Sequence, residues 1–358
     1  FSMKAVGYRF FHVYSIMHPS NFINMKTRLF FPILLLMLVS CKDKTVFQRN
    51  QGFIFNTSYH ISYASSKDLH AGIRQELEAF DASLSMFNPE STISRINRSD
   101  TGAIDLSGDP RVVYLLNEAI KISEITEGAF DITVAPLVNA WGFGTEQRKS
   151  MSSVDIDSLM QFVGYEKLQL EGFKLSKADA RVKLDASAIA KGYACDIIAE
   201  KLEQAGIKDY LVEIGGEIRM AGLNPKGQLW KVGIDKPIDD SLAVERELQA
   251  ALALTGKGMA TSGNYRNFYK IQNQKLGHTI DPHTGKPIQQ NILSATVVAS
   301  DALTADAYAT AFMVMGLEKA RALIDNLPGL EAYFIYSDDE GKLQTWISKG
   351  LQDALTTF

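Results

Sequence analysis

The chain has 358 residues, of which 46% are hydrophobic and 22% are charged. This balance is ordinary for a globular protein with ample apolar material for a core, and the length allows one large domain or two lobes. The formal net charge of −4 shows no excess of basic residues, so we expect no nucleic-acid partner.

A basic segment over residues 25–28 precedes an apolar run over residues 29–39. The run is too short to span a bilayer as a helix, but it fits the hydrophobic region of a secretory signal peptide. It leads into Ser40-Cys41, which resembles the end of a bacterial lipobox, whose cysteine is lipidated and becomes the mature N-terminus. A buried helix near the start of a soluble domain is the alternative interpretation.

These features predict how the chain is organised. Residues 1–24 are expected to be an upstream extension outside the fold, 25–40 a lipoprotein signal peptide, and 41–51 the lipidated cysteine with a polar tether. Residues 52–358 then form the functional domain. The expected location is the bacterial cell envelope, where the lipid would anchor the chain to a membrane facing the periplasm.

Cys41 and Cys195 are the two cysteines of the sequence. If Cys41 carries lipid, Cys195 has no cysteine partner, so no disulfide framework is expected. Because Cys195 lies in a helical pattern beside Tyr193 and Ala194, we expect it to be a buried side chain that behaves as a small hydrophobe.

Hydrophobic periodicity predicts the order of the elements. Alternating apolar residues over 59–63 indicate a strand, and helical spacing over 69–84 indicates a helix. Asp109-Pro110 is a favourable start for a second helix, which ends near Gly128. Further helices are expected over 187–206 and 303–315, and strands over 210–214, 229–234, 250–254, 267–271 and 292–299. Because helices and strands mix without a regular βαβ rhythm, the predicted fold class is α+β.

The common nucleotide-binding and hydrolase motifs are absent from the sequence. There is no G-x-G-x-x-G after a strand, no Walker A loop and no G-x-S-x-G motif. The six histidines are scattered, and none pairs with another histidine or a cysteine at zinc spacing. Any metal is therefore expected to be a hard cation on oxygen ligands.

Asp306 and Thr310 are four residues apart on the helix predicted over 303–315, so their oxygens project from one face. A carboxylate and a hydroxyl, completed by carbonyl oxygens and ligand phosphates, suit octahedral Mg²⁺. The alternative is a solvated aspartate with Thr310 bonding the carbonyl one turn back. Small and apolar neighbours such as Ala309 and Phe312 argue against an exposed face.

Asp185 and Lys191 bracket the start of the helix predicted over 187–206. Free backbone N–H groups and a lysine at such a place can hold a pyrophosphate, and an aspartate N-cap with a surface lysine is the alternative. His278 lies in an expected strand just before Asp281. Its usual pKa suits the removal of a proton from a hydroxyl nucleophile, and a strand histidine bonded to a carbonyl is the alternative.

The sequence contains four polar, glycine-rich blocks: residues 128–144, 185–193 with 213–217, 260–265 with 277–285, and 305–311. These blocks resemble the FAD:protein FMN transferase family, the ApbE-type flavin transferase lipoproteins. They follow one another in the family's order and at similar spacing, and the resemblance covers about residues 52–316.

The resemblance implies roles for individual residues. It implies that Asp306 and Thr310 bind Mg²⁺ together with the backbone carbonyl of Ala188, and that His278 is the general base. It also implies FAD contacts at positions from all parts of the domain, namely Phe55, Phe87, Ala129, Phe130, Asp131, Asp185, Lys191 and Ile280.

Two of these positions depart from the family pattern. Phe87 stands where the family often has tyrosine, so ring stacking is retained and a hydroxyl hydrogen bond is lost. Phe55-Asn56-Thr57 stands where the family usually has Met-Gly-Thr, so that Asn56 replaces a glycine.

The resemblance also implies a fold and an activity. The fold is a two-lobed α+β architecture, T-fold-like, with the FAD site in the cleft. The activity is Mg²⁺-dependent transfer of FMN from FAD to a threonine hydroxyl of a target redox protein, which forms a phosphoester-linked flavin and releases AMP. The implied partners are FAD as substrate, acceptor flavoprotein subunits of membrane redox complexes, and a membrane reached through the N-terminal lipid. The alternatives are an FAD pyrophosphatase and a non-enzymatic FAD-binding lipoprotein.

Overall fold

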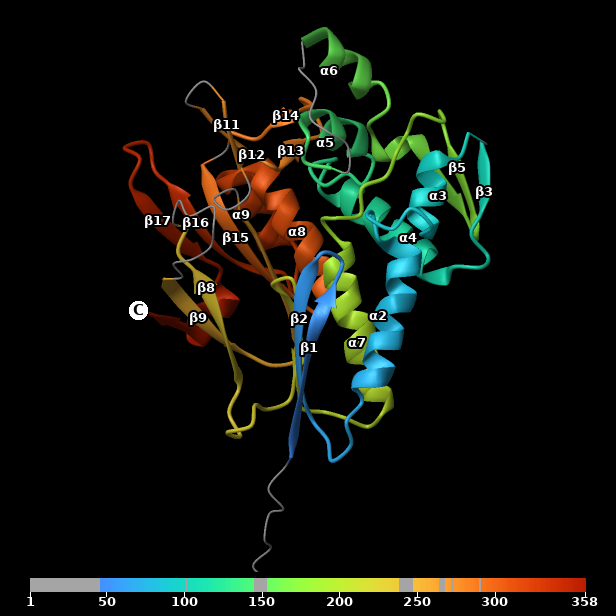
Figure 1. The fold of residues 1–358 in the computed structure, drawn as a ribbon. Helices are drawn as coiled ribbons and strands as arrows, with labels where there is room; N and C mark the ends of the chain where they lie inside the picture. Colours follow the sequence, from blue (N-terminus) through green and yellow to red (C-terminus); the bar gives the residue numbers. More distant parts are fainter. Residues whose placement is uncertain are drawn as a thin grey trace, which may run out of the picture. The chain divides into compact units, whose positions relative to one another are not determined.

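The computed structural model describes residues 46–358 except 101, 145–152, 238–246, 264–267, 272–273 and 290. The upstream extension, the signal peptide and Cys41 lie outside these residues, so their assignments stay predictions. The described part of the chain contains both helices and sheets (Figure 1), which confirms the α+β class. Within those ranges, no helix combines the length and apolar character needed to cross a membrane.

The largest sheet has eight antiparallel strands in the order β1-β2-β6-β7-β10-β15-β16-β17. In β6, Tyr210, Val212 and Ile214 are buried and alternate with partly exposed residues, as a strand that presents one face to a core requires. The strands are β1 (Phe47–Ile54), β2 (Thr57–Ala64), β6 (Tyr210–Ile214), β7 (Glu217–Ala221), β10 (Lys257–Gly263), β15 (Ile292–Ala299), β16 (Glu331–Ser337) and β17 (Leu343–Ile347).

Smaller sheets complete the strand arrangement. One three-stranded sheet has the order β18-β9-β8, another has the order β3-β5-β4, and two hairpins, β11–β12 and β13–β14, follow β10. Their strands are β3 (Ala103–Asp105), β4 (Leu168–Glu171), β5 (Lys174–Lys177), β8 (Trp230–Asp235), β9 (Leu248–Leu254), β11 (Phe268–Ile271), β12 (Gln274–Gly277), β13 (Ile280–Asp281), β14 (Lys286–Pro287) and β18 (Leu355–Thr357).

Some helices start where the sequence offers a side-chain cap. The Asp109 side chain accepts a hydrogen bond from the backbone N–H of Val112 at the start of α4, and Asp301 accepts one from Thr304 at the start of α8. The helices are α2 (His70–Leu84), α3 (Thr92–Arg98), α4 (Pro110–Ile125), α5 (Ala135–Trp141), α6 (Ser153–Met160), α7 (Ala190–Gln204), α8 (Ala302–Met315) and α9 (Leu317–Asn326), with 3₁₀ turns η1 (Tyr165–Lys167) and η2 (Lys349–Ala354).

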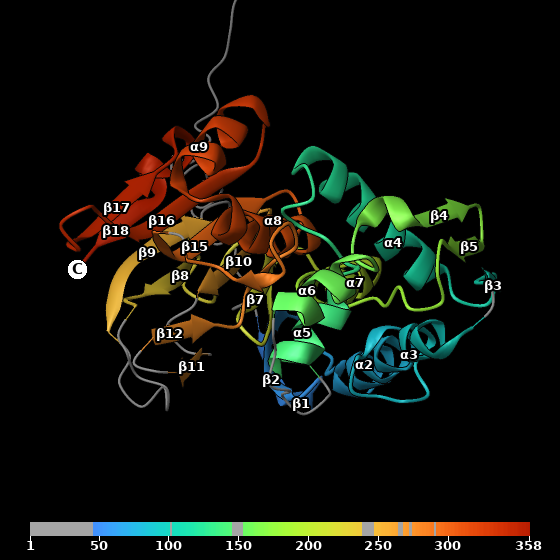
Figure 2. The ribbon, with the colours of Figure 1, turned by 90° about the horizontal axis from the view of Figure 1, so that it is seen from above.

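Neighbouring residues of β10 pack on opposite faces of the large sheet. Ala260 joins a hydrophobic cluster with residues of α7 and α8, whereas Met259 joins one with Trp230 of β8 and Leu252 of β9. The sheet therefore carries α7 and α8 on one face and the β8–β9–β18 sheet on the other (Figure 2). This layering decides which strand residues can reach α8.

Helices α7 and α8 touch at Gly192. A Cβ at this position would lie 2.2 Å from the carbonyl oxygen of Ala302, so only glycine allows the two backbones to come this close. Further along α7, the buried Asp196 carboxylate accepts hydrogen bonds from the backbone N–H groups of Ala302 and Leu303, at 2.9 and 2.8 Å. The start of α8 is thus held by α7 at two points.

Cys195 lies on the same helix and is fully buried, as the sequence predicts. Its thiol donates to the carbonyl oxygen of Glu217 at 3.2 Å. Burial raises the pKa of the thiol well above its usual value, because the charged thiolate would lie in an apolar interior.

The folded part begins earlier than the sequence suggests. β1 starts at Phe47, so part of the tether expected over 41–51 is a strand of the large sheet, and the boundary at Gly52 falls inside it. The polar composition of this stretch conceals the strand, because its ladder with β2 requires only backbone pairing. Asn50 is even buried, and its side-chain oxygen accepts a hydrogen bond from the Tyr63 hydroxyl at 2.8 Å.

Gly192→Ala should lower the free energy of unfolding by about 3 kcal/mol, because the added methyl group meets backbone atoms that cannot move without separating α7 from α8. Gly72→Ala is the matched control: Gly72 is also the third residue of its helix, but the nearest atom to its Cβ is Cε of Lys201 at 3.4 Å. We expect this control to be neutral or stabilising by up to about 1 kcal/mol. Urea unfolding of both variants measures the difference, and equal effects would contradict the close contact.

Candidate functional site

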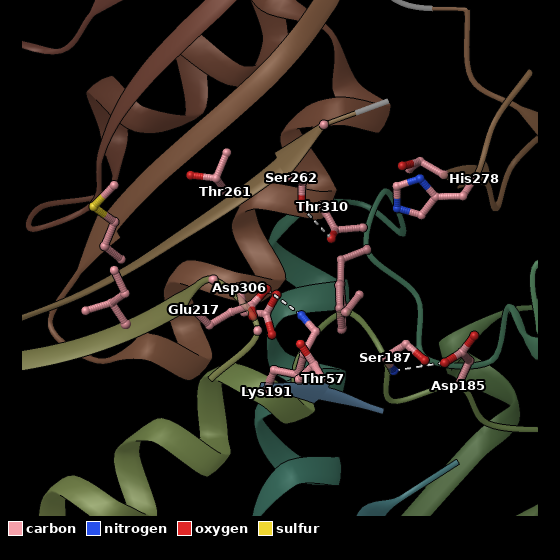
Figure 3. A pocket seen from close by; sticks show the side chains of 18 of the residues that line it. Thr57, Asp185, Ser187, Lys191, Glu217, Thr261, Ser262, His278, Asp306 and Thr310 are labelled. Carbon is pink, nitrogen blue, oxygen red and sulfur yellow. Dashed lines mark hydrogen bonds and ion pairs between the residues drawn. The ribbon is translucent and has the colours of Figure 1, made fainter. Parts of the chain in front are cut away.

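A cavity of about 900 Å³ lies where the β6–β7 turn, the end of β10 and the start of α7 approach α8. Residues 129–143, which include α5, contribute to its opposite side. The volume is near the upper end for small-molecule sites, as a ligand of dinucleotide size requires. Polar side chains from separate elements meet in this cavity (Figure 3), among them Lys191, Glu217, His278, Asp306 and Thr310.

Asp306 and Thr310 line the cavity from α8, as predicted from their spacing. Asp306 is 3% exposed, and one of its carboxylate oxygens accepts a hydrogen bond from the backbone N–H of Gly192 at 3.0 Å. The Thr310 hydroxyl lies 3.1 Å from the hydroxyl of Ser262, at the end of β10. The alternative of a solvated aspartate is excluded by this burial.

Lys191 forms an ion pair with Glu217 next to Asp306. Burial raises the pKa values of Glu217 and Asp306, and the positive charge of Lys191 opposes this effect. Burial alone would lower the pKa of Lys191, but Asp306 and Glu217 together raise it above its usual value. The second carboxylate oxygen of Glu217 is buried and has no hydrogen-bond partner among the described residues, so it can accept a donor or a cation.

The segment that leads into α7 also lines the cavity. Asp185 does not cap the helix: its carboxylate accepts a hydrogen bond from the backbone N–H of Ser187 at 2.8 Å. The helix begins at Ala190, later than predicted, and no described side chain caps it at Ile189. An uncapped helix start beside a lysine favours the oxygens of a phosphate.

Asp131 holds a loop at the edge of the cavity. One carboxylate oxygen accepts from the backbone N–H and the hydroxyl of Thr133, at 2.8 and 2.6 Å, and the other accepts from the N–H of Tyr165 at 2.8 Å. Burial raises its pKa, although the bonds from Thr133 oppose the change. The loop thus places Ala129 and the buried Phe130 at the cavity wall.

His278 lies in a bend between β12 and β13 and not in a strand, because the β11–β12 ladder ends at Gly277. Its half-buried side chain lines the cavity, and its ring centre lies 6.4 Å from that of Phe143 in an edge-on arrangement. Figure 3 shows the imidazole on the Thr310 side of the cavity.

The structure brings most of the predicted site residues together, although their contacts with FAD and Mg²⁺ stay predictions. Those that line the cavity are Ala129, Phe130, Asp131, Asp185, Ala188, Lys191, His278, Ile280, Asp306 and Thr310.

Phe55 and Phe87 are not among the cavity's lining residues. Phe55 and Asn56 form the β1–β2 turn with φ values of 51° and 59°, and the Phe55 ring packs on Phe80 with a centroid distance of 5.4 Å. Asparagine tolerates this left-handed backbone better than most residues, which explains how it can replace a glycine. Phe87 is 60% exposed and lines a second cavity of about 570 Å³ together with Lys183.

Glu217 is a residue that the sequence did not single out. One feature of the sequence could have pointed to it. Glu217 is a charged residue directly after Gly215-Gly216, at the first position of a strand whose next residue is apolar. Alternation places it on the helix side of the sheet, but its partner Lys191 is 26 residues away in sequence. Thr57 and Ser262 lie in segments that carry the resemblance, but no role was predicted for either, and the fold brings both to the cavity.

The donor set can be compared with what Mg²⁺ requires. No group of three or more His, Cys, Asp or Glu side chains in the described ranges is placed to form a metal site on its own. Mg²⁺, however, is commonly bound by one or two carboxylates that are completed by waters and substrate phosphates. The buried Asp306, the hydroxyl of Thr310 and the unpaired oxygen of Glu217 nearby fit such a shared site.

Comparisons with known proteins agree on one family. The sequence model of the ApbE family matches residues 55–334. An FAD:protein FMN transferase of Haemophilus influenzae is 37% identical over 321 residues, which cover 86% of this chain and 91% of that protein. The FAD:protein FMN transferase of Escherichia coli K12 is 38% identical over 301 residues, which cover 82% of this chain and 83% of that protein.

Solved structures show the same relationship. The flavin transferase ApbE from Vibrio cholerae superposes with a TM-score of 0.77 at 33% identity, covering 87% of this chain and 99% of that one. The apo form of the Pseudomonas stutzeri flavinyl transferase ApbE gives a TM-score of 0.75 at 32% identity, covering 87% and 97%. By sequence, fold and coverage, the chain belongs to the ApbE family.

Proposed function

We propose that this chain is an FAD:protein FMN transferase, an enzyme that moves FMN from FAD to a threonine hydroxyl of a target protein and releases AMP. One observation carries the proposal: in a member of the ApbE family, a buried aspartate and a threonine share a cavity with a lysine–glutamate pair and a histidine. Phosphoryl transfer depends on positioning and on compensation of charge, which such groups supply.

Asp306, Thr310 and the backbone carbonyl of Ala188 are the groups that would hold Mg²⁺. The bound cation would supply neutralisation of the negative charge on the FAD pyrophosphate. The N–H of Gly192 fixes one oxygen of Asp306, and Ser262 lies within hydrogen-bond distance of Thr310. Both side chains are therefore oriented before a substrate arrives, which lowers the entropy cost of binding.

His278 is the proposed base. It accepts the proton of the target threonine while the threonine oxygen forms a bond to the FMN phosphorus. The bond between that phosphorus and the bridging oxygen breaks, and AMP leaves with this oxygen and the bonding electron pair. The product is a phosphoester between FMN and the target protein.

Among the described residues that line the cavity, Lys191 is the one with a basic aliphatic side chain. Asp306 and Glu217 keep it protonated, and its place at the start of α7 brings it to the phosphate side of the site. Glu217 holds the ammonium in position, so the lysine need not lose rotamer freedom when FAD binds. We assign Lys191 to the pyrophosphate and Glu217 to the positioning of Lys191.

The predicted lipoprotein signal extends this proposal to location and partners. A chain anchored through Cys41 in the cell envelope, facing the periplasm, would meet flavin-carrying subunits of membrane redox complexes on that side. Such subunits are the proposed acceptors, with a threonine as the modified residue.

Asp306→Asn should abolish Mg²⁺-dependent transfer, because the amide removes the charged oxygen donor. His278→Ala should retain FAD binding and slow transfer by roughly 10²–10⁴-fold, as expected for loss of a general base. The measurement is the intact mass of a purified soluble domain of a flavin-carrying redox subunit after incubation with FAD and Mg²⁺. A gain equal to FMN less water, lost with EDTA, supports the transferase.

Asp301→Asn is the control for the aspartate, since Asp301 caps α8 but is not a lining residue of the cavity. It should transfer FMN at the wild-type rate. Release of FMN and AMP with an unmodified acceptor would favour a pyrophosphatase, in which water replaces threonine. FAD that stays bound and intact with Mg²⁺ present would favour a binding protein, and normal transfer by both site variants would refute the assigned residues.

Lys191→Met should lower the free energy of unfolding by about 2 kcal/mol in EDTA, because it leaves two buried carboxylates without their cation. Lys201→Met is the matched control on the same helix: Lys201 pairs with Glu76, but both side chains are more exposed than Glu217. Lys201→Met should lower the free energy of unfolding by less than about 1 kcal/mol. Urea unfolding gives both values, and equal losses would mean that Lys191 contributes no more than a surface pair.

A further inference from the structure

The cavity continues past the β6–β7 turn toward the other face of the large sheet. β7 pairs with β10 only along residues 257–259, whereas β10 continues to Gly263 in its ladder with β15. Over residues 261–263, the edge of β10 that faces β7 has no strand partner in the described ranges. The turn at Gly215-Gly216 ends short of this edge. Both glycines and residues 261–263 line the cavity.

Side chains of both sheet faces therefore reach one cavity. Ser262 points to the helix face, where it meets Thr310 of α8. Thr261 points to the other face, where its hydroxyl lies 2.9 Å from that of Thr296, and Met259 lies on this face as well. Figure 3 shows Thr261 and the Asp185–Ser187 segment on opposite sides of Asp306.

We call the part of the cavity on this other face the second arm. It is lined by Ile218, Val232, Gly233, Asp235, Leu248 and Met259. None of the six is basic, and one is an aspartate, so the arm is a poor site for phosphate oxygens. It contrasts with the opposite side of the cavity, where the start of α7 and Lys191 suit an anion.

The walls of the second arm offer backbone groups instead. β8 is the end strand of the β18-β9-β8 sheet, so its outer edge has no strand partner in the part of the chain that the structure describes. Gly233 on this strand is exposed, and the Leu248 side chain packs over the place where a Cβ of Gly233 would lie, so Leu248 forms the apolar surface beside this edge. Unpaired strand edges beside apolar side-chain pockets are what extended polypeptides bind.

The arm is also open to solvent. Leu248 at its rim is 47% exposed, whereas Val232 and Met259 deeper in the arm are 8% and 2% exposed. A polypeptide that continues on both sides of its reacting residue needs such an opening. The terminal ring of a nucleotide does not, since it can be enclosed.

In-line phosphoryl transfer places the attacking and leaving oxygens on opposite sides of phosphorus. If the AMP half of FAD lies on the side of Lys191 and α7, the attacking oxygen has to approach the FMN phosphorus from the opposite side. The second arm begins at Thr261, on the other side of Asp306 from the Asp185–Ser187 segment, and β10 connects it to Ser262 and Thr310 (Figure 3).

We propose that the second arm binds the acceptor polypeptide as an extended segment, which lies against the unpaired edges of β8 and β10 and brings its threonine to the reaction centre. This inference rests on the proposed transferase function and names the place where its protein substrate docks. Met259 and Ser262 are three residues apart, or about 10 Å along a strand. Apolar acceptor residues about three positions from the threonine therefore fill the arm.

Leu248→Asp tests the inference, because it places a charge in the arm, across from Asp235 of β8, at a position that is 47% exposed. Leu343→Asp is the matched control: Leu343 is 50% exposed, also begins a strand, and does not line the cavity. The probe is the purified soluble domain of a flavin-carrying redox subunit, with its acceptor threonine replaced by alanine as a negative control. FAD affinity is followed by quenching of flavin fluorescence.

We expect Leu248→Asp to raise KM for the acceptor at least 10-fold while the Kd for FAD changes less than 2-fold, and Leu343→Asp to change neither. Wild-type kinetics in Leu248→Asp, or a weakened affinity for FAD in place of the acceptor, would overturn the assignment of the arm alone. If the unaltered protein transfers no FMN to the probe, the proposed function fails and this inference fails with it.

A second measurement does not depend on catalysis. p-Benzoylphenylalanine in place of Leu248 should crosslink to the acceptor domain on illumination, and the same residue in place of Leu343 should not. Equal crosslinking at the two positions would show that contact at the arm is not specific and would overturn the inference.

Discussion

The contact between α7 and α8 at Gly192 is the constraint on which the site depends. The missing side chain lets the backbone of Ala302 lie against α7, and the N–H of the same glycine binds Asp306. Lys191 directly precedes this glycine, so the lysine and the aspartate are positioned by one contact. Asp196, one turn later, accepts two N–H groups of α8 and prevents that helix from rotating about the contact.

The contact between α7 and α8 also buries charged side chains. Asp306 and Glu217 would repel each other in an apolar interior, and the lysine between them reduces that cost. When all three are ionised, Asp306, Glu217 and Lys191 together carry a net negative charge, and Asp131, Asp185, Glu213 and Asp235 also line the cavity. A bound cation would reduce this excess of negative charge, so we expect the cation to favour the binding of an anionic phosphate and the two to bind interdependently.

Much of this site could be predicted where the relevant residues are close in sequence. The spacing of Asp306 and Thr310 was enough to place both oxygens on one face of a helix, because helix geometry fixes that relation. Glu217 was not predicted, since its importance comes from Lys191 across the β6–β7 turn. The position of His278 in a bend was also missed, because the end of a strand ladder is decided by its partner strand. The second arm lay beyond sequence reasoning altogether, as its walls come from strands that only the layered sheets unite.

The buried Cys195 has a practical consequence. In a soluble fragment that begins at Lys42 it is the sole cysteine, and its thiol is shielded, protonated and bonded to the carbonyl of Glu217. Thiolate is the species that reacts with maleimides and methanethiosulfonates, so this residue should stay silent under ordinary labelling conditions. A cysteine introduced on an exposed strand would then carry a spin label or fluorophore alone. The unaltered fragment is thus suitable for site-specific labelling, and Cys195 need not be removed from the core.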